Sequence, residues 1–202
     1  MGQLLDLQEA RRRLGLALEV LCHDRWVLGY VRGGGLQPIV VSEISRRLLQ
    51  PRPLNTLSRR ALFEQRPLVV NSVIPFTTPA SGFDWELDWP AIMYAPVGVA
   101  GQRPTGLLVL GCRRDYWYTD EDVQYASGLG AALAPMVSQL RGPLGRMTEP
   151  EAEVVHLMSC GMSREEIAKA IKAGSVEADA LIASVKRKLN QRTPHRIPVC
   201  VW

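Results

Sequence analysis

The chain has few cysteines, no long apolar run and, over most of its length, no lysine. Its four cysteines (Cys22, Cys112, Cys160 and Cys200) lie far apart and form no CxxC pair. This spacing argues against a zinc finger or a dense disulfide scaffold and fits a reducing cytoplasm. No apolar run approaches the roughly 18–20 residues that cross a bilayer, so we expect no membrane span. The first residues lack a basic stretch followed by an apolar one, so we expect no secretory signal and a cytoplasmic protein.

Lysine usage divides the chain. Residues 1–146 use arginine as their only strong base, and all the lysines come later: Lys169, Lys172, Lys186 and Lys188. Residues 141–146 contain Gly and Pro in a pattern typical of a short linker. We therefore predict a first domain over residues 1–140, a linker over 141–146 and a second domain over 147–202. The net charge of +4 is too mild to indicate nucleic-acid binding by itself.

The first domain shows an α+β pattern. Leucines spaced by three and four predict a first helix, and a Gly-Gly-Gly turn between two apolar runs predicts a hairpin. This order implies one antiparallel sheet flanked by helices. The expected elements are helices over residues 4–22, 55–64 and 119–140, and strands over 26–31, 39–41, 68–70, 92–97 and 105–111.

Three segments of the first domain resemble a GAF sensor domain. Residues 61–71 (ALFEQRPLVVN) are similar to its helix followed by Arg-Pro and two hydrophobic residues. Residues 95–99 and 106–111, followed by 118–122, resemble its closing strands and last helix. The resemblance covers roughly residues 5–140. It implies a domain that binds a small molecule or serves as a dimerisation scaffold.

Most of the aromatic residues lie between residues 76 and 125. One interpretation is a lid and pocket wall around a planar or apolar ligand. The other is that these side chains pack the edge of the sheet or cover a partner surface. The residues expected to bind a ligand under the first interpretation are Phe83, Trp85, Trp89 and Tyr94.

The first and last helices of this domain each carry an apolar stripe with alternating spacings of three and four. Two such stripes favour a four-helix bundle between two copies of the chain, and thus a homodimer. The alternative is that both helices pack on the domain's own sheet. The residues expected at the dimer interface are Leu7, Leu14, Leu18, Val123, Leu133 and Val137.

The second domain carries signals for three helices. Thr148 and Glu151, and then Ser163 and Glu166, have the spacing of two capping boxes. A third helix is predicted over residues 176–189, after a Gly-containing turn, so the arrangement is typical of a helix-turn-helix. About 45 residues resemble the LuxR/GerE-type helix-turn-helix. The matching residues are Thr148, Glu151, Glu153, Val154, Leu157, Gly161, Ser163, Glu166, Ile167, Ala168, Ile171, Val185, Arg187, Lys188, Leu189 and Arg192.

The start of the third helix departs from that family. The family opens this helix with Thr-Val-Lys and a following His, which meet phosphates and base edges. Here Glu177, Ala178, Asp179 and Leu181 take those positions, and the two carboxylates would repel a DNA backbone. We therefore expect weak DNA binding of low specificity. The residues expected to contact DNA are Ser163, Arg164, Ser175, Lys186, Arg187, Lys188 and Arg192.

The sequence offers little support for catalysis. The three histidines are scattered, no residues have metal-ligand spacing, and we expect no catalytic residue, metal or cofactor. Cys112 is interpreted as a small buried hydrophobic residue, and the alternative is a chromophore attachment or oxidant-sensing site. We interpret the chain as a bacterial transcriptional regulator with a sensing or dimerising domain. The alternative is a regulatory adaptor whose degenerate helix-turn-helix binds another regulator or RNA polymerase.

Overall fold

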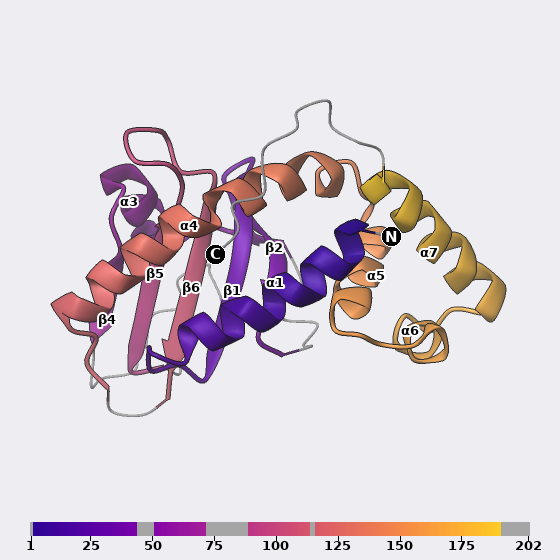
Figure 1. Cartoon of the computed structure of the whole chain (residues 1–202), viewed down its shortest axis with the longest axis horizontal. Coiled ribbons are helices and arrows are strands. Elements are labelled where there is room, and N and C mark those ends of the chain that lie inside the picture. Colours follow the sequence, from indigo (N-terminus) through magenta and orange to yellow (C-terminus); the bar gives the residue numbers. More distant parts are fainter. Residues whose placement is uncertain (1, 44–50, 72–88, 114–115, 191–202) are drawn as a thin grey trace. The chain divides into compact units, whose positions relative to one another are not determined.

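The computed structural model describes residues 2–43, 51–71, 89–113 and 116–190 (Figure 1). The chain divides into two compact units. One unit, here called the sensor unit, spans Arg11–Val137, and the other, the output unit, joins Met1–Ala10 to Ser138–Trp202. Among the described residues, no helix combines the length and the apolar character needed to cross a bilayer.

The sensor unit is built on an antiparallel sheet, as the sequence predicts. Its described strands follow the order β3-β2-β1-β6-β5-β4, and each neighbouring pair is antiparallel. The bounds are β1 Arg25–Arg32, β2 Gly35–Val41, β3 Arg52–Pro53, β4 Leu68–Asn71, β5 Ala91–Val97 and β6 Gly106–Cys112.

Helices cover both faces of this sheet, which explains the unbroken apolar sequences of β5 and β6. Every residue of these two strands is buried, as expected for strands covered on both sides. On one face lies α3 (Thr56–Glu64), whose Ala61 joins a cluster with Val27, Ile92 and Val109. On the other face lie α1 (Gly2–Leu18) and α4 (Asp120–Leu144), drawn in front of the sheet in Figure 1.

Glycine lets α4 approach the sheet closely. A Cβ atom added at Gly130 would overlap the carbonyl oxygen of Pro96 in β5. A Cβ atom added at Gly106 of β6 would lie 2.9 Å from Cγ1 of Val137. The apolar stripe of α4 therefore packs on the chain's own sheet.

The output unit contains three short helices after α4. They are α5 (Glu149–Ser159), α6 (Arg164–Ala170) and α7 (Ser175–Asn190). Both predicted capping residues at Ser163 and Glu166 are in place, since Ser163 N–H donates to Glu166 and Glu166 N–H donates to Ser163 Oγ. The core of the unit is formed by Val154, Val155, Leu157, Ile167, Ala178, Val185 and Leu189.

Two helix ends differ from the sequence prediction. The first helix ends at Leu18 rather than at residue 22, because the chain turns there and Leu21 N–H donates to the carbonyl of Leu18. The helix expected to end at residue 140 continues to Leu144, so residues 141–144 of the predicted linker are helical. Burial of Leu140 and Leu144 stabilises this last turn despite the Gly-Pro pair within it.

Candidate functional site

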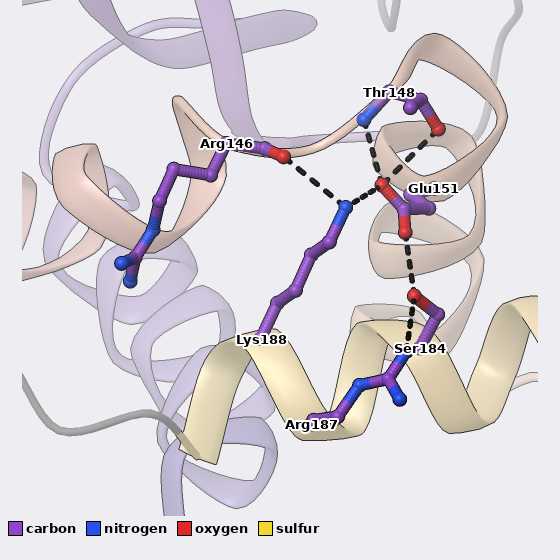
Figure 2. A network of polar contacts seen from close by, with 6 residues as sticks. All are labelled: Arg146, Thr148, Glu151, Ser184, Arg187 and Lys188. Atoms are coloured by element: carbon purple, nitrogen blue, oxygen red, sulfur yellow. Dashed lines mark hydrogen bonds and ion pairs between the residues drawn. The ribbon is translucent and has the colours of Figure 1, made fainter.

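A buried carboxylate organises the output unit. Glu151 lies in the first turn of α5, and its side chain is 6% exposed. Oε2 accepts hydrogen bonds from the Thr148 backbone N–H at 2.7 Å and from Lys188 Nζ at 2.5 Å. Oε1 accepts from Ser184 Oγ at 2.7 Å. Glu151 therefore joins the start of α5 to two successive turns of α7 (Figure 2).

These donors control the charge of Glu151. Burial alone would raise its pKa, but donation by Lys188, by Thr148 and by Ser184 outweighs burial and lowers the pKa to about 2. Glu151 is therefore a carboxylate at neutral pH. The network holds the anion in place and pairs it with the lysine ammonium.

The ammonium group of Lys188 is therefore bonded within the output unit. Its Nζ donates to Glu151 and also to the backbone carbonyl of Arg146 at 3.2 Å (Figure 2). The side chain is 25% exposed. The sequence predicts a DNA contact for Lys188, whereas its ammonium binds Glu151 and the Arg146 carbonyl within the unit.

Two further residues of the predicted DNA-binding set also have internal partners. Arg164 Nη2 forms an ion pair with Oδ2 of Asp179, which joins the start of α6 to the first turns of α7. Ser163 caps α6 through its side chain. Both residues are exposed, so the ion pair of Arg164 is a surface contact, and a role of either residue in DNA contact stays a prediction.

The outward face of α7 carries small apolar residues along its first turns. Val176, Ala180 and Ala183 are exposed and recur at spacings of four and three, and Val176 is 81% exposed. Ser175 and Glu177 are also exposed at the start of the helix. The first turns of this face thus present small apolar side chains and a carboxylate.

Within α7, the exposed positive charges lie near its C-terminal end. Lys186 and Arg187 are exposed, and Arg187 Nη2 also reaches Ser184 Oγ at 3.4 Å. Arg192, the last residue of the predicted set, lies outside the described residues. The structure thus separates the predicted basic cluster into two exposed cations and one internal cation.

Of the four predicted ligand-binding residues of the sensor unit, the structure describes two. Phe83 and Trp85 lie outside the described residues. Trp89 and Tyr94 are 2% and 1% exposed and belong to the cluster on the α3 face. The guanidinium carbons of Arg25 and Arg113 lie 5.7 and 5.3 Å from the Trp89 ring centroid, and Asn55 Nδ2 donates to the Tyr94 hydroxyl at 2.9 Å.

The residues predicted at the dimer interface are mostly covered by their own chain. Leu14, Leu18 and Val137 are 2%, 0% and 0% exposed. Val123 and Leu133 are half-buried, and the side chain of Leu7 lies outside the described part of the structure. The three buried residues are thus covered without a second copy of the chain, so they do not require a dimer.

Exposed apolar side chains lie elsewhere on the same two helices. Leu16 and Val20 are 51% and 68% exposed. Tyr125 of α4 is 37% exposed, and its hydroxyl donates to the carbonyl of Ala17 at 2.7 Å. This hydrogen bond places Tyr125 beside the exposed leucine and valine, so the three residues form one patch, here called the α1/α4 patch.

No family model and no curated protein sequence matches the chain. Its fold, however, is similar to that of solved structures with a TM-score of 0.54. A type II free methionine-R-sulfoxide reductase from Thermoplasma acidophilum is 16% identical, and the match covers 68% of this chain and 96% of the other. The GAF domain region of a protein from Geobacter sulfurreducens PCA is 21% identical, with coverages of 66% and 94%.

A third similar structure is the GAF domain of a phosphoenolpyruvate-protein phosphotransferase from Coxiella burnetii. It is 17% identical, has a TM-score of 0.54, and the match covers 67% of this chain and 84% of that domain. Identities this low carry information about the fold alone. These structural similarities, together with the antiparallel sheet between α3 and the α1–α4 pair, confirm the predicted α+β architecture. This chain therefore contains a domain with the GAF fold.

Proposed function

We propose that the chain is a transcriptional regulator in which the GAF-type domain senses a small molecule or joins two copies, and a helix-turn-helix delivers the output to DNA. The helix-turn-helix would consist of α5, α6 and α7, within a second domain over residues 147–202. The observation that carries the proposal is the arrangement of α7, which packs its inner face on α5 and α6 and leaves its outer face exposed. A recognition helix needs such an exposed face.

DNA binding by this unit would rest on phosphate contacts. Lys186 and Arg187 are the exposed cations of α7, and they would neutralise phosphates without reading the sequence. The first turns of α7 offer Val176 and Ala180 where a reader of base edges would carry Arg, Asn or Gln. We therefore propose weak binding with low sequence specificity.

A specific observation also favours the adaptor function. The exposed stripe of Val176, Ala180 and Ala183 is apolar and lies beside Glu177, which suits a protein surface better than a polyanion. In this second candidate function the same helix contacts a protein such as another regulator or RNA polymerase. The two functions use one face of α7 but differ in the charge that the partner must carry.

The sensor unit would supply the input. We propose that the sensor domain binds a planar or apolar ligand through Phe83, Trp85, Trp89 and Tyr94. A homodimer would use the α1/α4 patch, since those side chains are exposed while the inner stripes are buried. No cofactor or metal is part of this proposal, and the cytoplasm is the expected location.

Fluorescence anisotropy of labelled duplex DNA tests the output. The full chain is titrated into the regulator's own promoter fragment and into a scrambled duplex, each at two salt concentrations. We expect similar, weak affinities, and a log–log salt slope that falls by about two when Lys186→Ala and Arg187→Ala are combined. Arg59→Ala removes an exposed cation from α3 in the sensor unit, so it is the control and should leave the slope unchanged. Tight binding to one duplex would contradict the proposed low specificity, and no DNA binding would favour the adaptor.

A further inference from the structure

Two cysteines that are far apart in the sequence meet at one end of the sensor sheet. Cys22 lies in the turn between α1 and β1, and Cys112 is the last residue of β6. Their Sγ atoms lie 2.7 Å apart, and both residues are thiols. A disulfide bond is about 2.05 Å long, so a shift of roughly 0.65 Å would bring the two sulfur atoms to bonding distance.

Hydrogen bonds hold the two segments in this arrangement. Asp24 N–H donates to the carbonyl of Gly111 at 2.8 Å, and Arg113 N–H donates to Asp24 Oδ2 at 2.7 Å. These bonds tie both neighbours of Cys112, Gly111 and Arg113, to Asp24, which lies two residues after Cys22. The pair is therefore positioned by the backbone of β1 and β6 and not by a chance approach of two flexible side chains.

The segment before α4 also contacts the cysteine pair, through Tyr118. The Tyr118 hydroxyl donates to the carbonyl of Cys22 at 2.9 Å, and Tyr118 is 5% exposed. Burial, followed by the nearby cysteines, raises the pKa of Tyr118 well above its usual range, so the hydroxyl remains a donor. Tyr116 packs edge-on against Tyr118 with ring centroids 5.3 Å apart.

The two thiols differ in access to solvent. Cys22 is half-buried, whereas Cys112 is fully buried. A dissolved oxidant should therefore meet Cys22 before it meets Cys112. Such an asymmetry suits one cysteine that reacts with the oxidant and a second that resolves the product.

We propose that Cys22 and Cys112 form a reversible dithiol–disulfide site in the sensor unit, which a hydroperoxide oxidises. The Cys22 thiolate attacks one peroxide oxygen, the O–O bond breaks, and the products are a Cys22 sulfenic acid and water or an alcohol. The departing oxygen takes up the proton lost by the thiol. Cys112 sulfur then attacks Cys22 sulfur and the S–O bond breaks. The leaving hydroxide takes the Cys112 proton and becomes water.

The two thiols together supply the two electrons that reduce the peroxide. A dithiol reductant would reverse the reaction by thiol–disulfide exchange. The disulfide would tie the turn after α1 to the end of β6. This proposal does not depend on what α5, α6 and α7 bind.

Peptide mapping of the full chain tests the proposal. The protein is treated with hydrogen peroxide, alkylated with iodoacetamide and digested with trypsin. Cys22 then lies in residues 14–25 and Cys112 in residues 61–113, because Arg66 and Arg103 precede proline and resist cleavage. We expect a linked pair of these two peptides that dithiothreitol separates. Two alkylated peptides, or a linkage to Cys160 or Cys200, would overturn the proposal.

Variants separate the two roles. In Cys112→Ala the Cys22 sulfenic acid should persist and react with dimedone, whereas in the parent chain it should be lost to the disulfide. In Cys22→Ser, at a half-buried position, the buried Cys112 should stay a thiol during the same peroxide treatment. If Cys112→Ala does not fold, Cys22→Ser alone tests the order of the two cysteines. Cys160→Ser, in the other unit, is the matched control and should retain the linked peptide pair. Oxidation of Cys112 at the parental rate in Cys22→Ser would contradict the assigned order.

Discussion

Replacing Glu151 by glutamine should loosen the output unit while the sensor unit stays intact. The change removes a carboxylate that accepts from Thr148, Ser184 and Lys188, and it leaves the lysine without its counter-ion. A pKa lowered from 4.5 to about 2 corresponds to roughly 3 kcal/mol of stabilisation of the charged form. Because Lys188 is 25% exposed, we expect about 2–3 kcal/mol of destabilisation.

Amide hydrogen exchange measures this effect locally, which matters because a chain with two units need not unfold in one step. Protection of the slowest amides in α5 and α7 should fall by roughly 30- to 150-fold, while those in β5 and β6 keep their rates. Glu149→Gln is the matched control, because Glu149 is exposed in the same helical turn. It should change protection by no more than about threefold, the size of a helix-dipole effect.

The pH dependence gives a second check on Glu151. Its folded pKa lies below the unfolded value, so its stabilisation is present above about pH 4.5 and is lost as the pH falls toward 2. The parent chain and Glu151→Gln should therefore differ at pH 7 and converge near pH 2. Equal protection in the two proteins at pH 7 would refute the role assigned to this network.

Three further predictions concern the sensor unit. Gly130→Ala should destabilise it by about 1–3 kcal/mol because the new methyl group meets the sheet backbone, whereas Gly128→Ala, with open space around it, should be neutral or mildly stabilising in thermal unfolding. Trp89→Ala should cost about 3–5 kcal/mol in denaturant unfolding, since the ring is buried; a loss below about 1 kcal/mol would show that it does not support the fold. Leu16→Glu combined with Val20→Glu should convert any dimer to monomer in light scattering without loss of folded content; a dimer that persists would place the interface elsewhere.

Much of the fold was predictable because local patterns and tertiary packing agree. The helix expected over residues 55–64, the hairpin at residues 33–35 and the capping box at Ser163 each appear where the sequence predicts them. The helix reaches into the predicted linker because the burial of Leu140 and Leu144 outweighs the helix-breaking tendency of Gly and Pro. The two-residue strand β3 was missed because its pairing to β2, and not its own composition, defines it.

The candidate sites were harder to predict, because they depend on contacts between distant parts of the chain. Spacing identified Glu151 as a capping residue, but only the packing of α7 on α5 shows that it also binds Lys188 and Ser184. The same sequence run, Lys186 to Lys188, contains exposed cations and an internal one. The approach of Cys22 to Cys112 follows from the pairing of β1 with β6, which no local pattern reports.

The most direct test of the proposed output function is DNA titration of the full chain carrying Glu177→Thr with Asp179→Lys. The change takes these two positions from −2 to +1 and also releases Arg164 from its ion pair with Asp179. If α7 is a recognition helix weakened by its carboxylates, affinity for duplex DNA should rise and the log–log salt slope should steepen by roughly one for each new phosphate contact. Arg164→Ala in the same background should reverse part of the gain. Unchanged affinity and an unchanged slope would contradict the assignment of α7 as a DNA-facing helix.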